Sequence, residues 1–177
     1  MEQADLCRQV KSAVGSGDAL IVIPPFAGLD RPSLAAHTLQ ACARQAGLEV
    51  RVFYANLALA SLIGEVVYEA VCFAPTSGLL GERFFAATAY GVPAFGRDDP
   101  TIEAAITDLS NQVELTPEAF RSLETQIRDW VEALASAIIE TRFPVIGCST
   151  TFEQTAASVA LLNRIKKASP STVTIVG

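Results

Sequence analysis

The sequence predicts an α/β domain in which helices flank a parallel β-sheet, and three observations support this prediction. Residues 19–24 form a continuous apolar, β-branched run, which is typical of a strand buried on both faces of such a sheet. A helical pattern and a second strand follow this run, and the same strand–helix–strand order recurs near residue 144. Right-handed units of this kind place their strands in one parallel sheet.

The first strand–helix–strand unit follows directly from local signals. After the strand at 19–24, Pro32 stands where a helix can begin and Gly47 stands where that helix can end. Residues 49–54 then form the second strand. The apolar positions that recur at helical spacing between these two strands are Ala35, Leu39, Cys42 and Ala46.

The second unit has the same pattern near the end of the chain. Residues 144–149 are the third strand, residues 152–168 a helix with lysines in its last turn, and residues 172–176 the fourth strand. Four such strands with these helices indicate a parallel sheet of Rossmann or flavodoxin type. Because the sequence stops directly after an apolar strand, we expect a domain truncated after its fourth strand, with that strand's edge exposed.

A long helical insertion, about residues 57–140, separates the two units, and we expect it to cover one edge or end of the sheet. Residues 57–71 and 81–90 have helical patterns, and residues 91–100 are rich in Gly, Pro and Asp. A further helix begins at Thr116, with an apolar stripe that we expect in the core: Phe120, Leu123, Ile127, Trp130, Leu134 and Ile138. All 177 residues therefore belong to one domain.

Composition and charge limit the partners of the chain. The formal net charge of -6 argues against nucleic acid as a partner, because proteins that bind it usually carry a basic face. No apolar run approaches the ~18 residues of a membrane span, and the first residues lack a basic signal region. We therefore expect a cytoplasmic protein with no membrane partner.

The cysteines and the single histidine give little support to a metal site or a nucleophile. The four cysteines lie far apart and without a C-x-x-C pair, at Cys7, Cys42, Cys72 and Cys148. We expect buried thiols, and His37 on the surface of the first helix. Cys148 and Ser149 lack a G-x-S-x-G elbow, so a small stand-alone α/β enzyme is the least favoured alternative.

The candidate ligand site lies where doubly wound sheets bind ligands, beyond the carboxyl ends of the strands. Two loops end there. The first contributes Pro24, Pro25, Phe26 and Gly28. The second contributes Ser149, Thr150, Thr151, Phe152 and Gln154. Because the second loop leads into a helix, its hydroxyls and free backbone N–H groups either cap that helix or also contact the polar edge of a cofactor.

Standard nucleotide-binding motifs are absent from the sequence. No G-x-G-x-x-G follows the first strand, and no G-x-x-x-x-G-K-[ST] occurs anywhere. A phosphoacceptor receiver domain would need acidic residues at the end of the first strand, where this chain has Pro24 and Pro25. NAD binding, P-loop chemistry and phosphoacceptor function therefore have no support.

An ordered set of short motifs gives a family resemblance that spans nearly the whole chain. The motifs are PPF at 24–26, RPSL at 31–34, QAGLEV at 45–50, Asn56, Tyr68, GERFFA at 81–86, VIGCSTTFEQ at 145–154 and TIVG at 174–177. In this order and spacing, the chain resembles the N-terminal cobalamin-binding-like domain of radical SAM proteins that mature ribosomal peptide natural products (RiPPs).

The resemblance implies a larger parent enzyme. In that family a barrel follows, and its C-x-x-x-C-x-x-C motif holds a 4Fe-4S cluster that cleaves S-adenosylmethionine. This sequence has no such triplet, so the cluster and S-adenosylmethionine would belong to a barrel absent from this chain, and the chain alone would not be catalytic. The implied partners are the barrel domain and the peptide substrate of the parent enzyme, which would modify that peptide, for example by cobalamin-dependent methyl transfer.

The resemblance also implies how cobalamin would be held. Mutase-type domains supply a histidine to cobalt through D-x-H-x-x-G, and the segment that begins at Asp30 does not match it. Cobalamin would therefore be bound without histidine ligation, against the loops 24–28 and 149–154, with Phe26 and Phe152 as an apolar platform. The alternative is a scaffold or substrate-recognition domain of the same fold that holds no cofactor.

Overall fold

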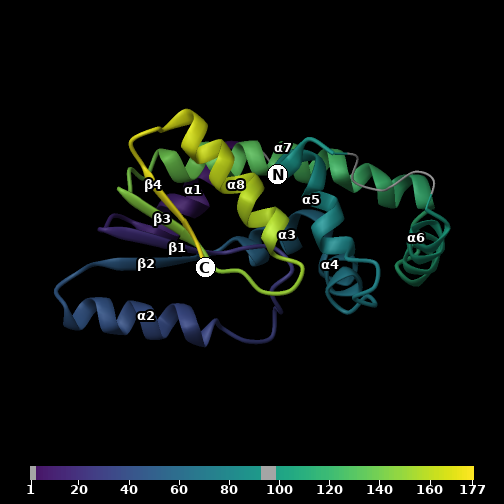
Figure 1. The fold of residues 1–177 in the computed structure, drawn as a ribbon, viewed down its shortest axis with the longest axis horizontal. Coiled ribbons are helices and arrows are strands. Elements are labelled where there is room, and N and C mark those ends of the chain that lie inside the picture. Colours follow the sequence, from purple (N-terminus) through teal and green to yellow (C-terminus); the bar gives the residue numbers. More distant parts are fainter. Residues whose placement is uncertain (1–2, 93–98) are drawn as a thin grey trace.

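The computed structural model describes residues 3–92 and 99–177 and confirms the predicted α/β class (Figure 1). Its four-stranded sheet is parallel throughout, with the strand order β2-β1-β3-β4. The strands are β1 (Ala19–Ile23), β2 (Val50–Tyr54), β3 (Val145–Cys148) and β4 (Val173–Val176). Each lies within its predicted segment, shortened by one or two residues at the ends where turns begin.

The two faces of the sheet differ in burial. On one face, Leu20 of β1 pairs in register with Ile146 of β3, and both side chains are buried. On the other face the residues are also apolar, but Ile21 is only partly buried and Ile175 of β4 is 51% exposed. The sheet therefore has one face in the core and one face that is largely uncovered.

Three helices pack together on the buried face: α1 (Gln3–Val14), α7 (Pro117–Ile139) and α8 (Thr155–Ala168). The N-terminus of α7 is capped as its sequence predicts, because the Thr116 side chain accepts a hydrogen bond from the N–H of Ala119 at 3.1 Å. The predicted core stripe of α7 is buried throughout. Helix α1 is not predicted above, although its Leu6, Val10 and Val14 recur at helical spacing and are buried.

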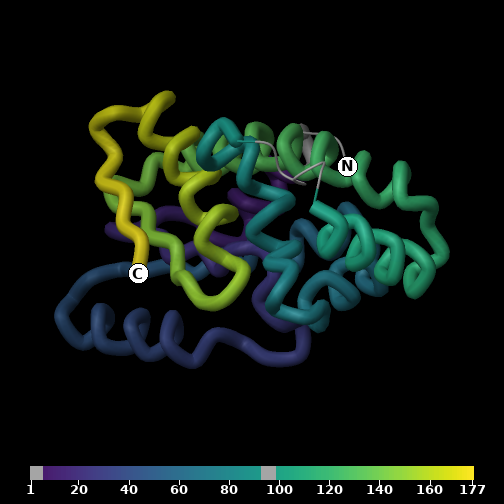
Figure 2. The backbone as a smooth tube through the Cα atoms, turned by 45° about the vertical axis from the view of Figure 1, so that its right-hand side comes forward, coloured from purple at the N-terminus to yellow at the C-terminus, as the bar shows by residue number. Residues whose placement is uncertain are grey.

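The helix of the first unit, α2 (Leu34–Gln45), lies on the opposite side of the sheet from α7 and α8 (Figures 1 and 2). The Ser33 side chain caps its N-terminus. Within α2, Ala36 is the buried residue, whereas Leu39 is 60% exposed. The apolar stripe read from the sequence is therefore exposed, because α2 packs on β2 at the sheet edge and no other described helix lies beside it.

The insertion contains α3 (Ala55–Ile63), α4 (Glu65–Cys72), α5 (Leu80–Tyr90) and α6 (Pro100–Gln112) in addition to α7. The single helical pattern at 57–71 is two helices, because Gly64 has a φ of 90° and the chain bends there by 119°. Most of the predicted loop at 91–100 lies outside the described residues, and α6 is not predicted above. Helices α4–α6 lie beyond the carboxyl ends of the strands, as expected, but α7 returns along the buried face (Figure 1).

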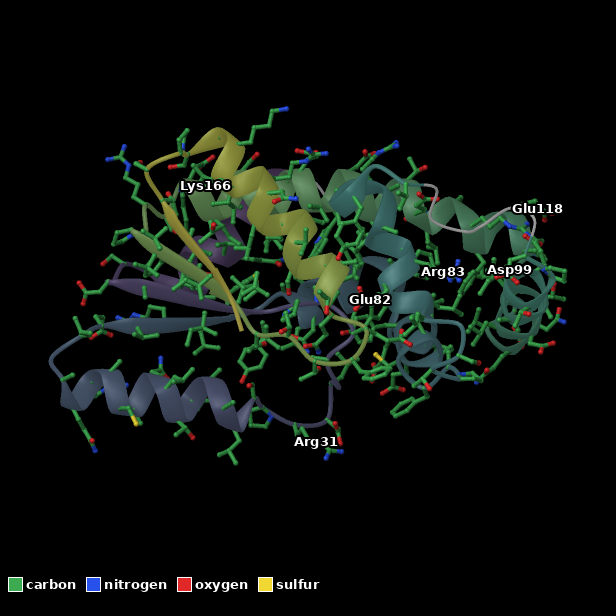
Figure 3. All side chains as sticks on the ribbon, in the orientation of Figure 1. Arg31, Glu82, Arg83, Asp99, Glu118 and Lys166 are labelled. Atoms are coloured by element: carbon green, nitrogen blue, oxygen red, sulfur yellow. The ribbon has the colours of Figure 1, made fainter. Side chains whose placement is uncertain are left out.

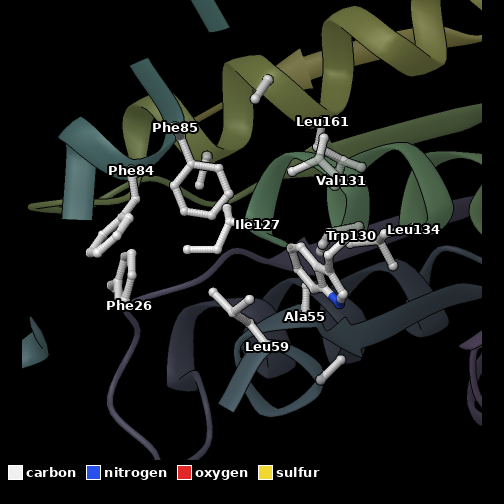
Figure 4. Close-up of a cluster of buried hydrophobic side chains, with 14 of the residues drawn as sticks. Phe26, Ala55, Leu59, Phe84, Phe85, Ile127, Trp130, Val131, Leu134 and Leu161 are labelled. Carbon is white, nitrogen blue, oxygen red and sulfur yellow. The ribbon is translucent and has the colours of Figure 1, made fainter. Parts of the chain in front are cut away.

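Aromatic residues join the insertion to the sheet layer (Figure 4). The ring of Phe26, after β1, lies 6.0 Å from Phe85 and 6.2 Å from Phe84, both on α5. Helix α5 also packs along α8. No described helix alone is long and apolar enough to cross a membrane; α3 and α4 reach that length and composition together, across their bend.

Candidate functional site

An open cleft of about 620 Å³ lies at the carboxyl ends of β1 and β3. The strand order reverses at this point, because α2 leads from β1 to β2 on one side and α8 leads from β3 to β4 on the other. Open α/β sheets bind ligands at such a reversal. The cleft is therefore in the part of the fold where a ligand site is expected.

Both predicted loops reach this cleft, although not with every predicted residue. Its lining includes six of the nine candidates, namely Phe26, Gly28, Ser149, Thr150, Thr151 and Gln154. Pro24 and Pro25 are buried outside the lining, and Phe152 is 71% exposed and does not line the cleft. The structure thus brings the two loops together but does not form the apolar platform expected from Phe26 and Phe152.

Other lining residues are missing from the candidates above. They include Tyr54, Asn56, Ala35, Cys72 and Phe73. Tyr54 and Asn56 could have been found by the rule applied to the two loops, because they lie at the carboxyl end of β2. Cys72 and Phe73 reach the cleft from the end of α4, and nothing in the sequence signals that packing.

The first loop is held in place by the core beneath it. Phe26 has a φ of 65°, and its ring, 6% exposed, lies 5.3 Å from that of Tyr68. The Tyr68 hydroxyl donates a hydrogen bond to the carbonyl of Ala27 at 2.8 Å. Most of the Phe26 ring is therefore core, and the aromatic rings that the cleft offers to a ligand are those of Phe73, which is 80% exposed, and Tyr54, which is partly buried.

The first three backbone N–H groups of the second loop are already bonded within the chain. Those of Ser149 and Thr150 donate to main-chain carbonyls, and that of Thr151 donates to the side chain of Gln154 at 3.2 Å. We expected some of these groups to be free for a ligand. The loop instead offers the cleft mainly its side-chain hydroxyls.

The N-terminus of α8 is capped by a carboxylate from the insertion. Glu82 of α5 accepts hydrogen bonds from the N–H groups of Thr155 at 2.8 Å and Ala156 at 2.6 Å (Figure 3 labels Glu82). These donors and the positive end of the helix dipole are what a bound phosphate would use. A carboxylate of this chain takes that place, so a phosphate is disfavoured at this helix.

Glu153, between the second loop and α8, is buried and conformationally unusual. It is 8% exposed, has a φ of 65°, and accepts a hydrogen bond from the N–H of Gly81 at 2.7 Å. Burial raises the pKa of its carboxyl group above the usual glutamate value. The contact joins α5 to the loop that lines the cleft.

We expect Glu153→Gln to raise the free energy of unfolding at neutral pH, because burial disfavours the ionised carboxylate and the amide carries no charge. Because the pKa of Glu153 is raised in the folded chain, the wild type loses stability relative to the variant as the pH rises from the ordinary glutamate pKa through the raised value. Below this window both side chains are neutral and the difference vanishes. Urea unfolding across the acid and neutral range measures it, and a less stable variant at neutral pH would contradict the prediction.

The charged side chains of the described lining compensate each other. Its charged residues are Asp30 and Arg31, which pair at 2.6 Å. Arg31 extends away from the sheet at the edge of the molecule (Figure 3). The remaining polar groups are hydroxyls and amides, so the cleft is suited to an uncharged ligand.

The thiols near the strands are poor nucleophiles. Burial raises the pKa of Cys72 to about 12 and that of Cys148, which is 3% exposed, also to about 12. Both therefore stay protonated at neutral pH, which disfavours a stand-alone enzyme that uses Cys148 as its nucleophile. The expectation of buried thiols holds for Cys148, whereas Cys42 is exposed.

The described residues contain no group of three or more metal-ligating side chains. His37 is exposed, as expected, and its ring nitrogens lie 2.8 Å from the Tyr54 hydroxyl and 3.2 Å from Gln40 Oε1. It is not among the residues that line the cleft.

The fold and the cleft define a Rossmann-like α/β domain with an open, uncharged cleft at the reversal of strand order. No protein-family model, curated protein or solved structure matches this chain.

Proposed function

We propose that the chain is a cofactor-binding domain, the N-terminal cobalamin-binding-like domain of a radical SAM enzyme of RiPP maturation. The observation that carries the proposal is the position of the cleft: it lies at the reversal of strand order, and both loops named by the family resemblance line it. Its volume of about 620 Å³ is within the range of small-molecule sites.

The residues of the cleft fit one part of cobalamin better than another. The hydroxyls and amides of the lining and the exposed ring of Phe73 suit the amide-bearing edge of a corrin. The phosphate of the nucleotide tail would meet Arg31, which is already paired with Asp30. No histidine lines the described cleft, so cobalt would be held without histidine ligation.

In this proposal the chain binds and orients the cofactor, and the reaction takes place elsewhere in the parent enzyme. Bound cobalamin supplies methyl-transfer chemistry. The barrel with its 4Fe-4S cluster and S-adenosylmethionine is the proposed partner domain, and a peptide is the proposed substrate. Of the chain's own residues, Phe26 and Phe73 line the cleft and would exclude water from that side of the ligand.

The test is a titration of the chain with hydroxocobalamin, followed by corrin absorbance. We expect saturable binding, and we expect Ala35→Phe to weaken it by about tenfold or more, because Ala35 lines the cleft and a phenyl ring there fills it. The matched control is Ala41→Phe, at another exposed alanine of α2 that does not line the cleft.

The outcomes separate the parts of the proposal. No uptake of hydroxocobalamin by the wild-type chain or by the full-length parent protein would remove the cofactor role. Equal weakening by both phenylalanine variants would place the cofactor away from the cleft. Weakening by the Ala35 variant alone supports the proposal.

A scaffold role is the second candidate, and the open face of the sheet favours it. Val173 and Ile175 of β4 are each 51% exposed, and Leu39 of α2 is 60% exposed on the same side of the molecule. Apolar surface of this kind marks sites where another domain packs. If hydroxocobalamin does not bind, we propose that the radical SAM barrel is the domain that packs on this surface.

A further inference from the structure

Asn56 carries a buried acceptor that the chain itself does not use. It lies in the first turn of α3, lines the cleft and is 1% exposed. Its Nδ2 donates a hydrogen bond to the carbonyl of Gly28 at 3.3 Å, which sets the orientation of the amide. Its Oδ1 has no hydrogen-bond partner among the described residues.

An unpaired acceptor of this kind is costly, and its cost indicates the chemistry of a ligand. A buried polar group without a hydrogen-bond partner has lost its contacts with water and gained nothing in return. A ligand that donates an N–H or O–H to Asn56 Oδ1 would give this acceptor a hydrogen bond and offset the cost. A ligand without a donor would leave the acceptor unpaired in the complex as well. The cleft therefore discriminates in favour of donors at this position.

The rest of the cleft restricts the charge and shape of the ligand. The second loop adds the hydroxyls of Ser149, Thr150 and Thr151 to the lining, while the backbone N–H groups of these three residues are already bonded. The charged residues of the described lining form one ion pair. A phosphate monoester would bring negative charge to a cleft with no unpaired cation.

We propose that the cleft binds an uncharged ligand with a flat apolar body, stacked at Phe73, and with an N–H or O–H donor that pairs with Asn56 Oδ1. The inference rests on the proposed ligand-binding role of the cleft and specifies its ligand class, but it does not require cobalamin. Asn56 is then the residue that selects for a donor.

The experiment follows the backbone amide signals of the ¹⁵N-labelled chain at millimolar probe concentrations. Riboflavin and its phosphate monoester, FMN, test charge; nicotinamide and N,N-dimethylnicotinamide test the donor. We expect riboflavin to bind at least about tenfold more tightly than FMN, and nicotinamide to shift the signals of the cleft while its dimethyl form does not. Asn56→Leu should weaken riboflavin binding by about tenfold or more.

The probe pairs keep the inference testable even where the Asn56 variant does not fold, since they use the wild-type chain. Equal binding within each pair, or no shift of cleft signals by any of the four probes, overturns the inference. If the chain binds hydroxocobalamin but does not show these preferences among the probes, the proposed function is supported and the proposed ligand class is wrong. If the chain shows the preferences but does not bind hydroxocobalamin, the ligand class is supported and the cobalamin function is wrong.

Discussion

Replacing Phe85 by alanine is expected to lower the free energy of unfolding by about 3–5 kcal/mol, the usual cost of removing a phenyl ring from a packed core. Phe85 is 0% exposed and makes an edge contact with Phe26 at 6.0 Å. It lies where α5 of the insertion packs near the loop after β1 (Figure 4). Urea unfolding followed by circular dichroism measures the loss.

The matched control is Phe73→Ala, because this phenylalanine is 80% exposed. We expect it to change the free energy of unfolding by no more than about 0.5 kcal/mol. Similar losses at both positions would contradict the packing of α5 described above. A large loss at Phe85 alone would show that the insertion is part of the core.

Replacing Gly81 by alanine is expected to destabilise the fold by about 2–3 kcal/mol, since it overpacks a buried contact. A Cβ at this position would lie 2.6 Å from Glu153 Oε2 and 2.8 Å from a ring carbon of Phe26. Neither neighbour can move freely, because the carboxylate is bonded to the Gly81 N–H and the ring is packed among aromatics. Thermal and urea unfolding measure the effect.

Gly78→Ala is the control for Gly81→Ala, because it makes the same substitution of glycine by alanine in the turn before α5. A Cβ at Gly78 would meet its nearest neighbour, Leu80 Cγ, at 3.5 Å, an ordinary contact. We expect a change of no more than about 0.5 kcal/mol. An equally stable Gly81 variant would mean that α5 and the 149–154 loop do not approach as closely as described.

The parallel sheet could be predicted from the sequence because its strands are short apolar runs separated by helical patterns. Residues 19–24 and 144–149 carry this signal most clearly, and both form central strands. The exposure of α2 could not be predicted in the same way. Its apolar positions have helical spacing, but this spacing does not show whether a second helix covers them. That depends on which side of the sheet each connecting helix crosses, and local sequence patterns do not indicate this.

The insertion was predicted only in part, for two physical reasons. Gly64 breaks one apolar pattern into two helices, and a glycine inside such a pattern does not reveal whether it bends the chain. Helix α1 is less apolar on average than α7, and the apolar face of α6 is less pronounced than that of α7, so both helices are weaker signals. The stripe of α7 was clear because it extends over about five turns of a 23-residue helix.

The candidate site was predicted by position better than by chemistry. The rule on strand ends identified the two loops, and six of their nine candidate residues line the cleft. The bonding of the loop N–H groups was not predicted, because those of Ser149 and Thr150 donate to the carbonyls of Val22 and Gly177, which are distant in sequence. Contacts between distant segments leave no local pattern in the sequence.

The pairing of β1 with β3 also has a consequence for how the chain is made. Ala19 pairs with Val145, so the central pair of strands joins segments separated by about 125 residues. During synthesis on the ribosome, β1 must therefore wait until most of the chain has emerged before its neighbour on that side is available. We expect the nascent chain to keep apolar strand surface uncovered during this interval, and chaperones that bind such surface to associate with it before the cleft exists.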